Sequence, residues 1–166
     1  SHADPAAELP MMAVLLDAKI VAAGPDGERE IPAEDFFTAP LTTVLAPDEI
    51  VVAVDLPGLP AATGWGFEEF AQRRGDFAVA GVAALVTREG GTVTNTRIAL
   101  MGLHDTPVRA RSAEAAFGES GIEAAAVAAR QDADPMNDLH GSADYRRHLA
   151  EALTRRVLTA ALERAA

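Results

Sequence analysis

The chain has 166 residues, a formal net charge of −11 and no cysteine. This length suffices for one ordinary hydrophobic core or two small ones. The negative charge argues against a general nucleic-acid binder, which needs a basic surface, and the lack of cysteine excludes disulfides and iron–sulfur ligation by this chain. No apolar run approaches the ~20 residues that span a bilayer, and the polar first residues do not resemble a signal peptide, so we expect a cytoplasmic protein.

Acidic residues are concentrated in the first third of the chain. Residues 1–60 hold eleven acidic side chains against Lys19 and Arg29, whereas the rest of the chain is nearly neutral. This distribution has two interpretations. It is either an acidic surface facing solvent or an acidic face that meets a basic partner subunit.

The first third predicts a short helix and a small sheet. Asp4 followed by Pro5 is typical of a helix start with Asp4 as the N-cap, and apolar residues on nearly every face predict that this helix, at 6–16, is buried. The other elements expected here are a hairpin of strands at 19–23 and 28–31 around the turn 24–27, at most one helical turn at 33–37, a loop at 38–47 and a buried β-branched strand at 49–56.

Residues 56–63 are rich in Pro and Gly and show no periodicity, which indicates a boundary. The sequence therefore predicts an α+β protein of two parts, 1–58 and 64–166. The elements expected in the second part are a hairpin of strands at 79–87 and 93–103, helices at 111–117 and 121–130, an acidic loop at 131–141 and a long helix from Ser142 to about Arg164. These give a three-stranded antiparallel sheet covered by helices.

Large side chains should anchor the cores of so alanine-rich a protein. The aromatic residues expected to do so are Trp65, Phe67, Phe70, Phe77 and Tyr145. On the long helix, one apolar face runs from Tyr145 to Ala161 at i, i+4 spacing. Its arginines, Arg146 among them, are predicted to flank that face.

Residues 73–77, with the sequence RRGDF, are the best candidate for a binding site. Guanidinium groups beside an aromatic ring can grip a planar anionic group, because they supply fixed donors and a flat face. The alternative is a charged turn with Phe77 as the first core residue of the next strand. The pair His104-Asp105, at the end of a predicted strand, has two interpretations: it is a functional dyad, or its residues only form the turn that follows the strand. The scattered histidines and the spacing of Asp134 and Asp138 predict no metal site, and no catalytic residue is expected.

Six segments in one order resemble the FAD-binding medium subunit of molybdenum hydroxylases, the carbon monoxide dehydrogenase and xanthine dehydrogenase group. They are residues 2–10, 32–37, 45–50, 64–84, 97–109 and 138–147. The resemblance implies the end of the second FAD-binding lobe followed by a C-terminal α+β domain. The first lobe, with its pyrophosphate-binding loop, would precede Ser1, so the FAD site is expected to be incomplete in this chain.

The resemblance also implies flavin-contacting positions. Those it places at FAD are Asp4, Glu8, Val51, Glu69, Asp76 and Phe77. Glu8 matches an acidic FAD contact, Val51 an aliphatic residue near the ring, and Phe77 an aromatic against the isoalloxazine, with Asp76 holding the turn of that loop. Glu69 stands where xanthine dehydrogenases have a lysine beside the flavin, and a carboxylate there would disfavour negative charge on reduced flavin.

The function implied is electron relay. Substrate would be oxidised at a molybdenum cofactor on a large subunit, and electrons would pass through iron–sulfur clusters on a small subunit to FAD and then to an outside acceptor. One alternative is a non-catalytic interaction domain whose acidic first part docks the other subunits. Another is an independent small-molecule binder that uses the turn at 73–77.

Overall fold

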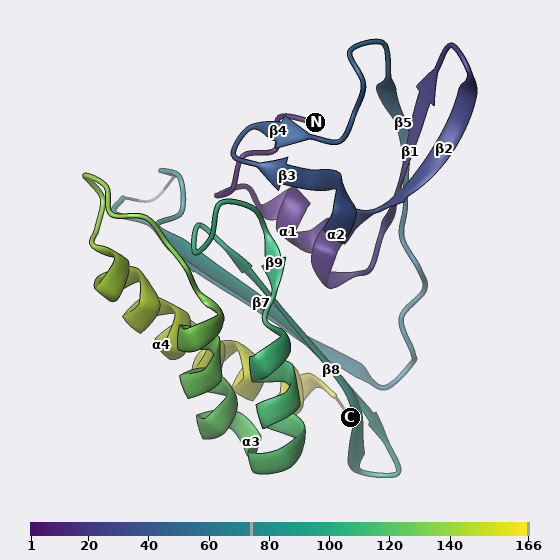
Figure 1. The fold of residues 1–166 in the computed structure, drawn as a ribbon. Coiled ribbons are helices and arrows are strands. Elements are labelled where there is room, and N and C mark those ends of the chain that lie inside the picture. The colour runs from purple at the N-terminus through teal and green to yellow at the C-terminus, as the bar shows by residue number, and fades with distance from the viewer. Residues whose placement is uncertain (74, 166) are drawn as a thin grey trace.

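The computed structural model describes residues 1–73 and 75–165, and it has the α+β fold that the sequence predicts (Figure 1). The elements of the first part are α1 (Glu8–Leu15), β1 (Lys19–Gly24), β2 (Gly27–Pro32), α2 (Ala33–Phe36), β3 (Phe37–Ala39), β4 (Thr42–Thr43) and β5 (Ile50–Asp55). Those of the second part are β6 (Thr63–Phe70), β7 (Ala80–Glu89), β8 (Thr92–Met101), β9 (Val108–Arg109), α3 (Arg111–Asp132) and α4 (Ala143–Arg164).

The first part is a three-stranded antiparallel sheet in the order β2-β1-β5. The predicted hairpin is confirmed, and Gly27 closes its turn at φ 109°, a conformation that favours glycine. Ile20 and Ile31 pair across β1 and β2 and are buried together with Phe36 of the single-turn helix α2. The small sheet therefore has one apolar face, which α2 helps to cover.

Three expectations for this part are wrong. Residues 38–47 are not a structureless loop, because β3 and β4 form a two-stranded ribbon within them. The strand β5 is largely exposed rather than buried, since it lies at the edge of the sheet with Ile50 at 67% exposure. The helix α1 begins at Glu8 with Ala7 as its N-cap, so Asp4 does not cap it.

The second part is a four-stranded antiparallel sheet in the order β6-β7-β8-β9, one strand more than predicted. The extra strand, β9, has only two residues, which pair with Ala99 and Leu100 of β8. Two residues are too few to show the period-2 pattern of a strand, so the sequence gives no signal for it. The helices are as expected: α3 bends at Gly121, and Ser142 caps α4 by accepting a hydrogen bond from the Tyr145 amide at 3.2 Å.

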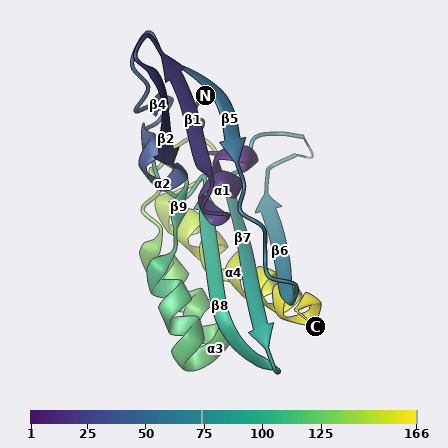
Figure 2. The same ribbon diagram turned by 90° about the vertical axis from the view of Figure 1, so that its right-hand side faces the viewer.

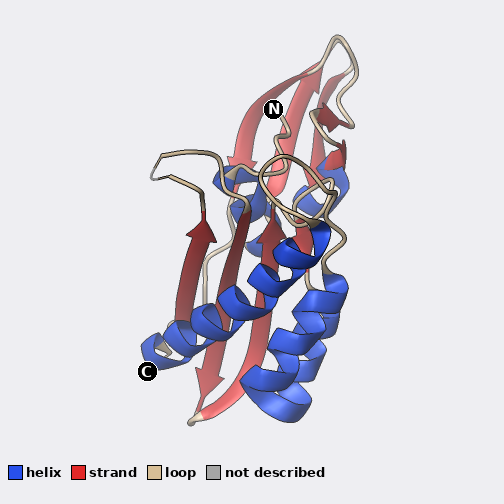
Figure 3. Ribbon diagram, turned by 90° about the vertical axis from the view of Figure 1, so that its left-hand side faces the viewer, coloured by secondary structure: helices blue, strands red, loops and turns tan. Residues whose placement is uncertain are grey.

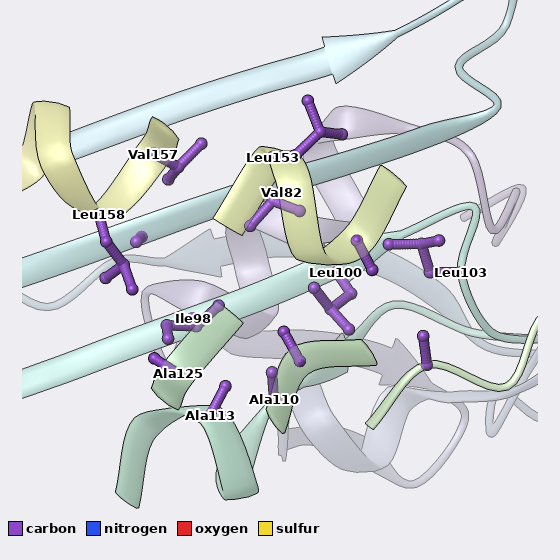
Figure 4. Packing of buried hydrophobic residues seen from close by; sticks show 14 of the residues in the cluster. Val82, Ile98, Leu100, Leu103, Ala110, Ala113, Ala125, Leu153, Val157 and Leu158 are labelled. Carbon is purple, nitrogen blue, oxygen red and sulfur yellow. The ribbon is translucent and has the colours of Figure 1, made fainter. Parts of the chain in front are cut away.

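The helices α3 and α4 cover one face of this sheet (Figure 3). Val82 and Leu100 of the sheet meet Leu153 and Leu158 of α4, and alanines of α3 close the other side (Figure 4). The helix α4 approaches β6 very closely, because a Cβ at Gly66 would lie 2.2 Å from the Val157 carbonyl oxygen. Small residues thus allow contact between backbones where large ones would keep the layers apart.

The helix α1 lies on the opposite face of the same sheet (Figure 2). Met11 and Leu15, one turn apart, pack against Leu85 and Met101 of β7 and β8. Val14, on another side of α1, belongs to the core of the first part. One helix therefore contributes to two cores.

Ion pairs strengthen this junction. The carboxylate of Asp17, just after α1, meets the Arg109 guanidinium at 2.7 Å and that of Arg97 at 2.9 Å. Arg109 is almost fully buried and also bonds Glu114 at 2.6 Å. On α2, Glu34 accepts two hydrogen bonds of 2.8 Å from Arg111 at the start of α3.

Four of the five aromatic residues expected to anchor the cores are exposed, and only Phe70 packs, partly buried, against the core of the second part. Trp65 is 56% exposed, Phe77 78%, and Phe67 and Tyr145 are exposed as well. The buried volume is filled mainly by Val, Leu, Ile and Ala, together with Phe36 in the first part and Phe117 of α3 in the second. The Trp65 ring lies under the guanidinium of Arg164, 4.2 Å from the ring centre. Within residues 1–73 and 75–165, no helix has the length and apolar character that crossing a membrane requires.

Candidate functional site

A cleft of about 590 Å³ opens where the first part meets the second. Four segments that are far apart in sequence contribute most of its lining: residues 4–6, 75–79, 102–105 and 135–140. Its volume falls within the range of roughly 300–1,000 Å³ that is typical of small-molecule sites. Three further cavities among the described residues are lined by none of the predicted site residues.

The loop between β6 and β7 presents Phe77 to this cleft. The loop is closed at its base by the Val79 amide, which donates to the Phe70 carbonyl at 2.7 Å. At its tip the Asp76 amide donates to the Arg73 carbonyl at 3.1 Å, and Gly75 takes φ 92°. The tight turn pushes Phe77 outward. The expectation that Phe77 is the first core residue of the next strand is therefore wrong, while Arg74 lies outside the described residues.

The N-terminal segment forms a second wall. Asp4 accepts a hydrogen bond at 2.9 Å from the Ala6 amide through Oδ1, and its carbonyl accepts one at 3.1 Å from Ala7. Asp4 therefore shapes a turn just before α1. The carbonyl of Pro5 accepts a hydrogen bond from the Gly102 amide at 2.8 Å, which fastens this segment to the end of β8.

Of the six predicted site residues, the structure brings Asp4, Asp76 and Phe77 together on the cleft. Glu8 and Glu69 lie outside the lining, close enough to each other that the charge of Glu8 acts on Glu69. Slight desolvation of this exposed residue, and then this repulsion, raise the pKa of the Glu69 carboxyl above its ordinary value. Val51 lies in β5 and packs beside the core of the first part, away from the cleft lining.

Sequence inspection missed Arg146, which was expected to flank the apolar face of α4. Its side chain is buried and lines the cleft. The guanidinium bonds the carbonyl oxygens of Val79 and Gly102, the latter at 2.9 Å, and the carboxylate of Asp138. A signal was present, because Arg146 stands three, four and seven residues before buried Leu149, Ala150 and Leu153.

Asp138 and His104 also line the cleft, and neither is among the six predicted site residues. The hydrogen bond from Arg146 is the main cause that holds the pKa of the Asp138 carboxyl below its ordinary range. The other oxygen of Asp138 accepts from the amides of His140 and Gly141 at 2.8 and 3.1 Å. The Nδ1 atom of His104 is buried and has no partner among the described residues. It is thus a polar group that a bound ligand could satisfy.

The cleft brings an exposed aromatic ring together with carboxylate and imidazole groups. Residues 65–161 match the family model described as the CO dehydrogenase flavoprotein C-terminal domain. The chain belongs to this family. Residues 1–59 match a second model, the FAD binding domain in molybdopterin dehydrogenase, so the flavoprotein resemblance extends over both parts of the chain.

Curated flavoprotein relatives align along almost the whole chain. The 6-hydroxypseudooxynicotine dehydrogenase complex subunit alpha of Paenarthrobacter nicotinovorans is 39% identical over 99% of this chain and 58% of its own length. The carbon monoxide dehydrogenase medium chain of Hydrogenophaga pseudoflava is 34% identical over 100% of this chain and 60% of its own length. The chain therefore spans about three-fifths of these relatives.

Solved structures share the fold. A carbon monoxide dehydrogenase from Hydrogenophaga pseudoflava that lacks the Mo-pyranopterin moiety superposes with a TM-score of 0.94 at 38% identity, covering 99% of this chain and 59% of the other. Quinoline 2-oxidoreductase from Pseudomonas putida 86 gives a TM-score of 0.90 at 36% identity, with the same coverage. These matches confirm the family that the sequence segments indicated.

Proposed function

We propose that this chain is the C-terminal part of the FAD subunit of a cytoplasmic, molybdenum-containing dehydrogenase or hydroxylase. The subunit would take electrons from iron–sulfur clusters on a small subunit, after substrate oxidation at a molybdenum cofactor on a large subunit, and pass them to an outside acceptor. The observation that carries this proposal is the exposed Phe77 ring, held over a cleft of small-molecule size in a chain of this family.

The residues of the cleft fit one end of a flavin. Phe77 offers the face of an aromatic ring, on which a flat heterocycle can stack. Asp4 and Asp76 supply carboxylate acceptors, and the unpartnered Nδ1 of His104 supplies one more polar contact. The cleft therefore combines an apolar surface with a few polar groups, which is the usual composition of cofactor sites.

The role of this chain would be to bind FAD and to orient its ring. When bound, FAD supplies the redox chemistry, so no acid, base or nucleophile is required of the protein. Phe77 would fix the plane of the ring, and the loops at 75–79 and 135–140 would restrict the access of water. Within the described residues, His104 Nδ1 has no hydrogen-bond partner, so His104 and Asp105 do not form a dyad through that atom.

The FAD site would be completed by residues outside this chain. The relatives that align here are longer by about two-fifths of their length, and that part would hold the remainder of the cofactor. We therefore expect the 166-residue chain alone to bind FAD weakly and the full subunit to bind it tightly. Tight, stoichiometric binding of FAD to the chain alone would contradict an incomplete site.

The test of the site is Phe77→Ala in the full subunit, followed by quenching of flavin fluorescence. Loss of an aromatic stacking partner should weaken FAD binding about threefold to tenfold. The matched control is Phe67→Ala, because Phe67 is also exposed but lies on β6 outside the cleft. Equal affinities for wild type and Phe77→Ala would place the flavin elsewhere.

A further inference from the structure

One buried guanidinium stands at the centre of the cleft wall. Arg146 projects from the first turn of α4 and is 7% exposed. Its Nη1 atom donates to the carbonyl oxygens of Val79 and Gly102, and its Nη2 atom donates to Asp138 Oδ2. Each acceptor belongs to a different segment that lines the cleft.

The fourth segment is reached through one more hydrogen bond. Gly102 accepts from Arg146 through its carbonyl and donates its amide to the Pro5 carbonyl at 2.8 Å, beside Asp4. Gly102 has φ 66°, and a Cβ there would lie 3.0 Å from the Val79 carbonyl oxygen, so any other residue would be both strained and crowded at this position. All four walls of the cleft are thus tied to Arg146, directly or through Gly102.

Stability alone does not explain an arginine at this position. A cation removed from water needs full compensation, yet the Nε atom of Arg146 is buried without a partner among the described residues. An apolar side chain of similar size often serves stability as well or better in such a place. What an apolar residue cannot do is hold two carbonyls and a carboxylate in fixed directions, which a planar guanidinium does.

We infer that Arg146 is a positioning residue that sets the geometry of the flavin cleft. It fixes the position of the Phe77 loop relative to the turn at Asp138. This inference rests on the proposed function. It adds to that function the side chain whose hydrogen bonds connect the four segments that line the cleft. Phe77 would contribute to binding only while Arg146 holds the base of its loop at Val79.

The decisive experiment is a double-mutant cycle in the full FAD subunit, with FAD affinity as the measurement. Arg146→Met should weaken binding by about tenfold or more, the order expected when a charged hydrogen-bonding group is lost. In that background, the further effect of Phe77→Ala should fall below about twofold, because the ring is already misplaced. Arg156→Met is the control. Arg156 lies on the same helix, is exposed and pairs with Glu68 outside the cleft.

Two other measurements keep the test decisive if Arg146→Met folds poorly. Asp138→Asn removes the charge of only one partner of the guanidinium. In this background the effect of Phe77→Ala on FAD affinity should also fall, but by less than in Arg146→Met. Amide hydrogen exchange at Val79 and Gly102 should accelerate in both variants and not in Arg156→Met. Additive effects of Arg146→Met and Phe77→Ala, or unchanged exchange at these amides, would overturn the inference.

Failure of the proposed function gives a different result. If the wild-type subunit does not bind FAD, the proposed function is wrong, while faster exchange at Val79 in the variants would still show that Arg146 positions the loop. If wild type binds FAD and Phe77→Ala weakens it independently of Arg146, the proposed function stands and the positioning role is wrong.

Discussion

At Glu69, the local electrostatic environment lowers the stability of the folded state when the carboxyl group is charged. Glu69 is the last residue but one of β6 and lies on the side of the sheet where α1 packs, and Glu8 begins that helix. The residue is exposed, and slight desolvation together with the neighbouring carboxylate raises the pKa of Glu69, so the folded state modestly disfavours its charged form. A carboxyl with a raised folded pKa lowers stability above that pKa, and the penalty disappears as the pH falls below the ordinary value.

We therefore predict that Glu69→Gln raises the urea midpoint of unfolding at pH 7 and that the gain vanishes near about pH 3, where carboxyls are protonated in both states. Glu69→Lys should raise the midpoint further at pH 7, because a cation would then face Glu8. Urea titrations at the two pH values make the comparison. A gain that grows as the pH is lowered would contradict the assigned cause.

At the scale of elements, the close contact between β6 and α4 depends on glycine, which has no side chain, at the point of contact. A Cβ at Gly66 would lie 2.2 Å from the carbonyl oxygen of Val157, an atom of the helix backbone that cannot rotate away. Gly66→Ala should therefore push α4 from the sheet and destabilise the protein by roughly 1–3 kcal/mol, as overpacking does. The measurement is the free energy of unfolding from urea titration.

Gly118→Ala is the control for that substitution. Gly118 lies in α3 with nothing within 4 Å of its added Cβ and has no positive φ. Alanine should stabilise this helix by about 0.4–1 kcal/mol, because it restricts the unfolded chain and suits a helix. Equal changes in the free energy of unfolding for Gly66→Ala and Gly118→Ala would mean that the close approach of α4 to β6 does not cause the destabilisation.

Turn chemistry and periodicity predicted most of these elements. Gly24-Pro25-Asp26-Gly27 and Glu89-Gly90-Gly91 fix where two hairpins reverse, and the i, i+4 apolar face of α4 fixes which side is buried. The strand β5 was placed correctly but assigned to a core. Its apolar run is the same in a central and an edge strand, so periodicity does not reveal how many neighbours a strand has.

Residue chemistry alone predicts only one wall of the candidate site, at residues 73–77, and Asp4 on another wall is predicted only through the family resemblance. An aromatic residue beside arginines, Gly and Asp is unusual enough to mark residues 73–77. The other walls come from residues 4–6, 102–105 and 135–140, and their meeting depends on tertiary contacts through Arg146. An arginine in a helix is usually solvated, so its burial could be inferred only from its spacing to Leu149 and Leu153.

At the scale of the whole molecule, α1 makes the two parts of the chain one folding unit. Its Met11 and Leu15 are buried against β7 and β8, whereas Val14 is buried in the core of the first sheet. The ion pairs of Asp17 with Arg97 and Arg109 add a second connection beside the helix. Unfolding either core should therefore remove contacts that hold the other.

Substitutions on the two sides of α1 test this coupling through Trp65, the single tryptophan, which lies in β6. Leu15→Ala should destabilise the protein by about 2–5 kcal/mol. Val14→Ala removes two buried methyl groups and should cost about 2 kcal/mol at ~0.8 kcal/mol each. If the chain unfolds as one unit, both variants shift the urea transition seen by Trp65 fluorescence, and the far-ultraviolet circular dichroism transition coincides with it. Separate folding of the parts would leave the Trp65 transition of Val14→Ala at the wild-type midpoint while the circular dichroism transition splits in two.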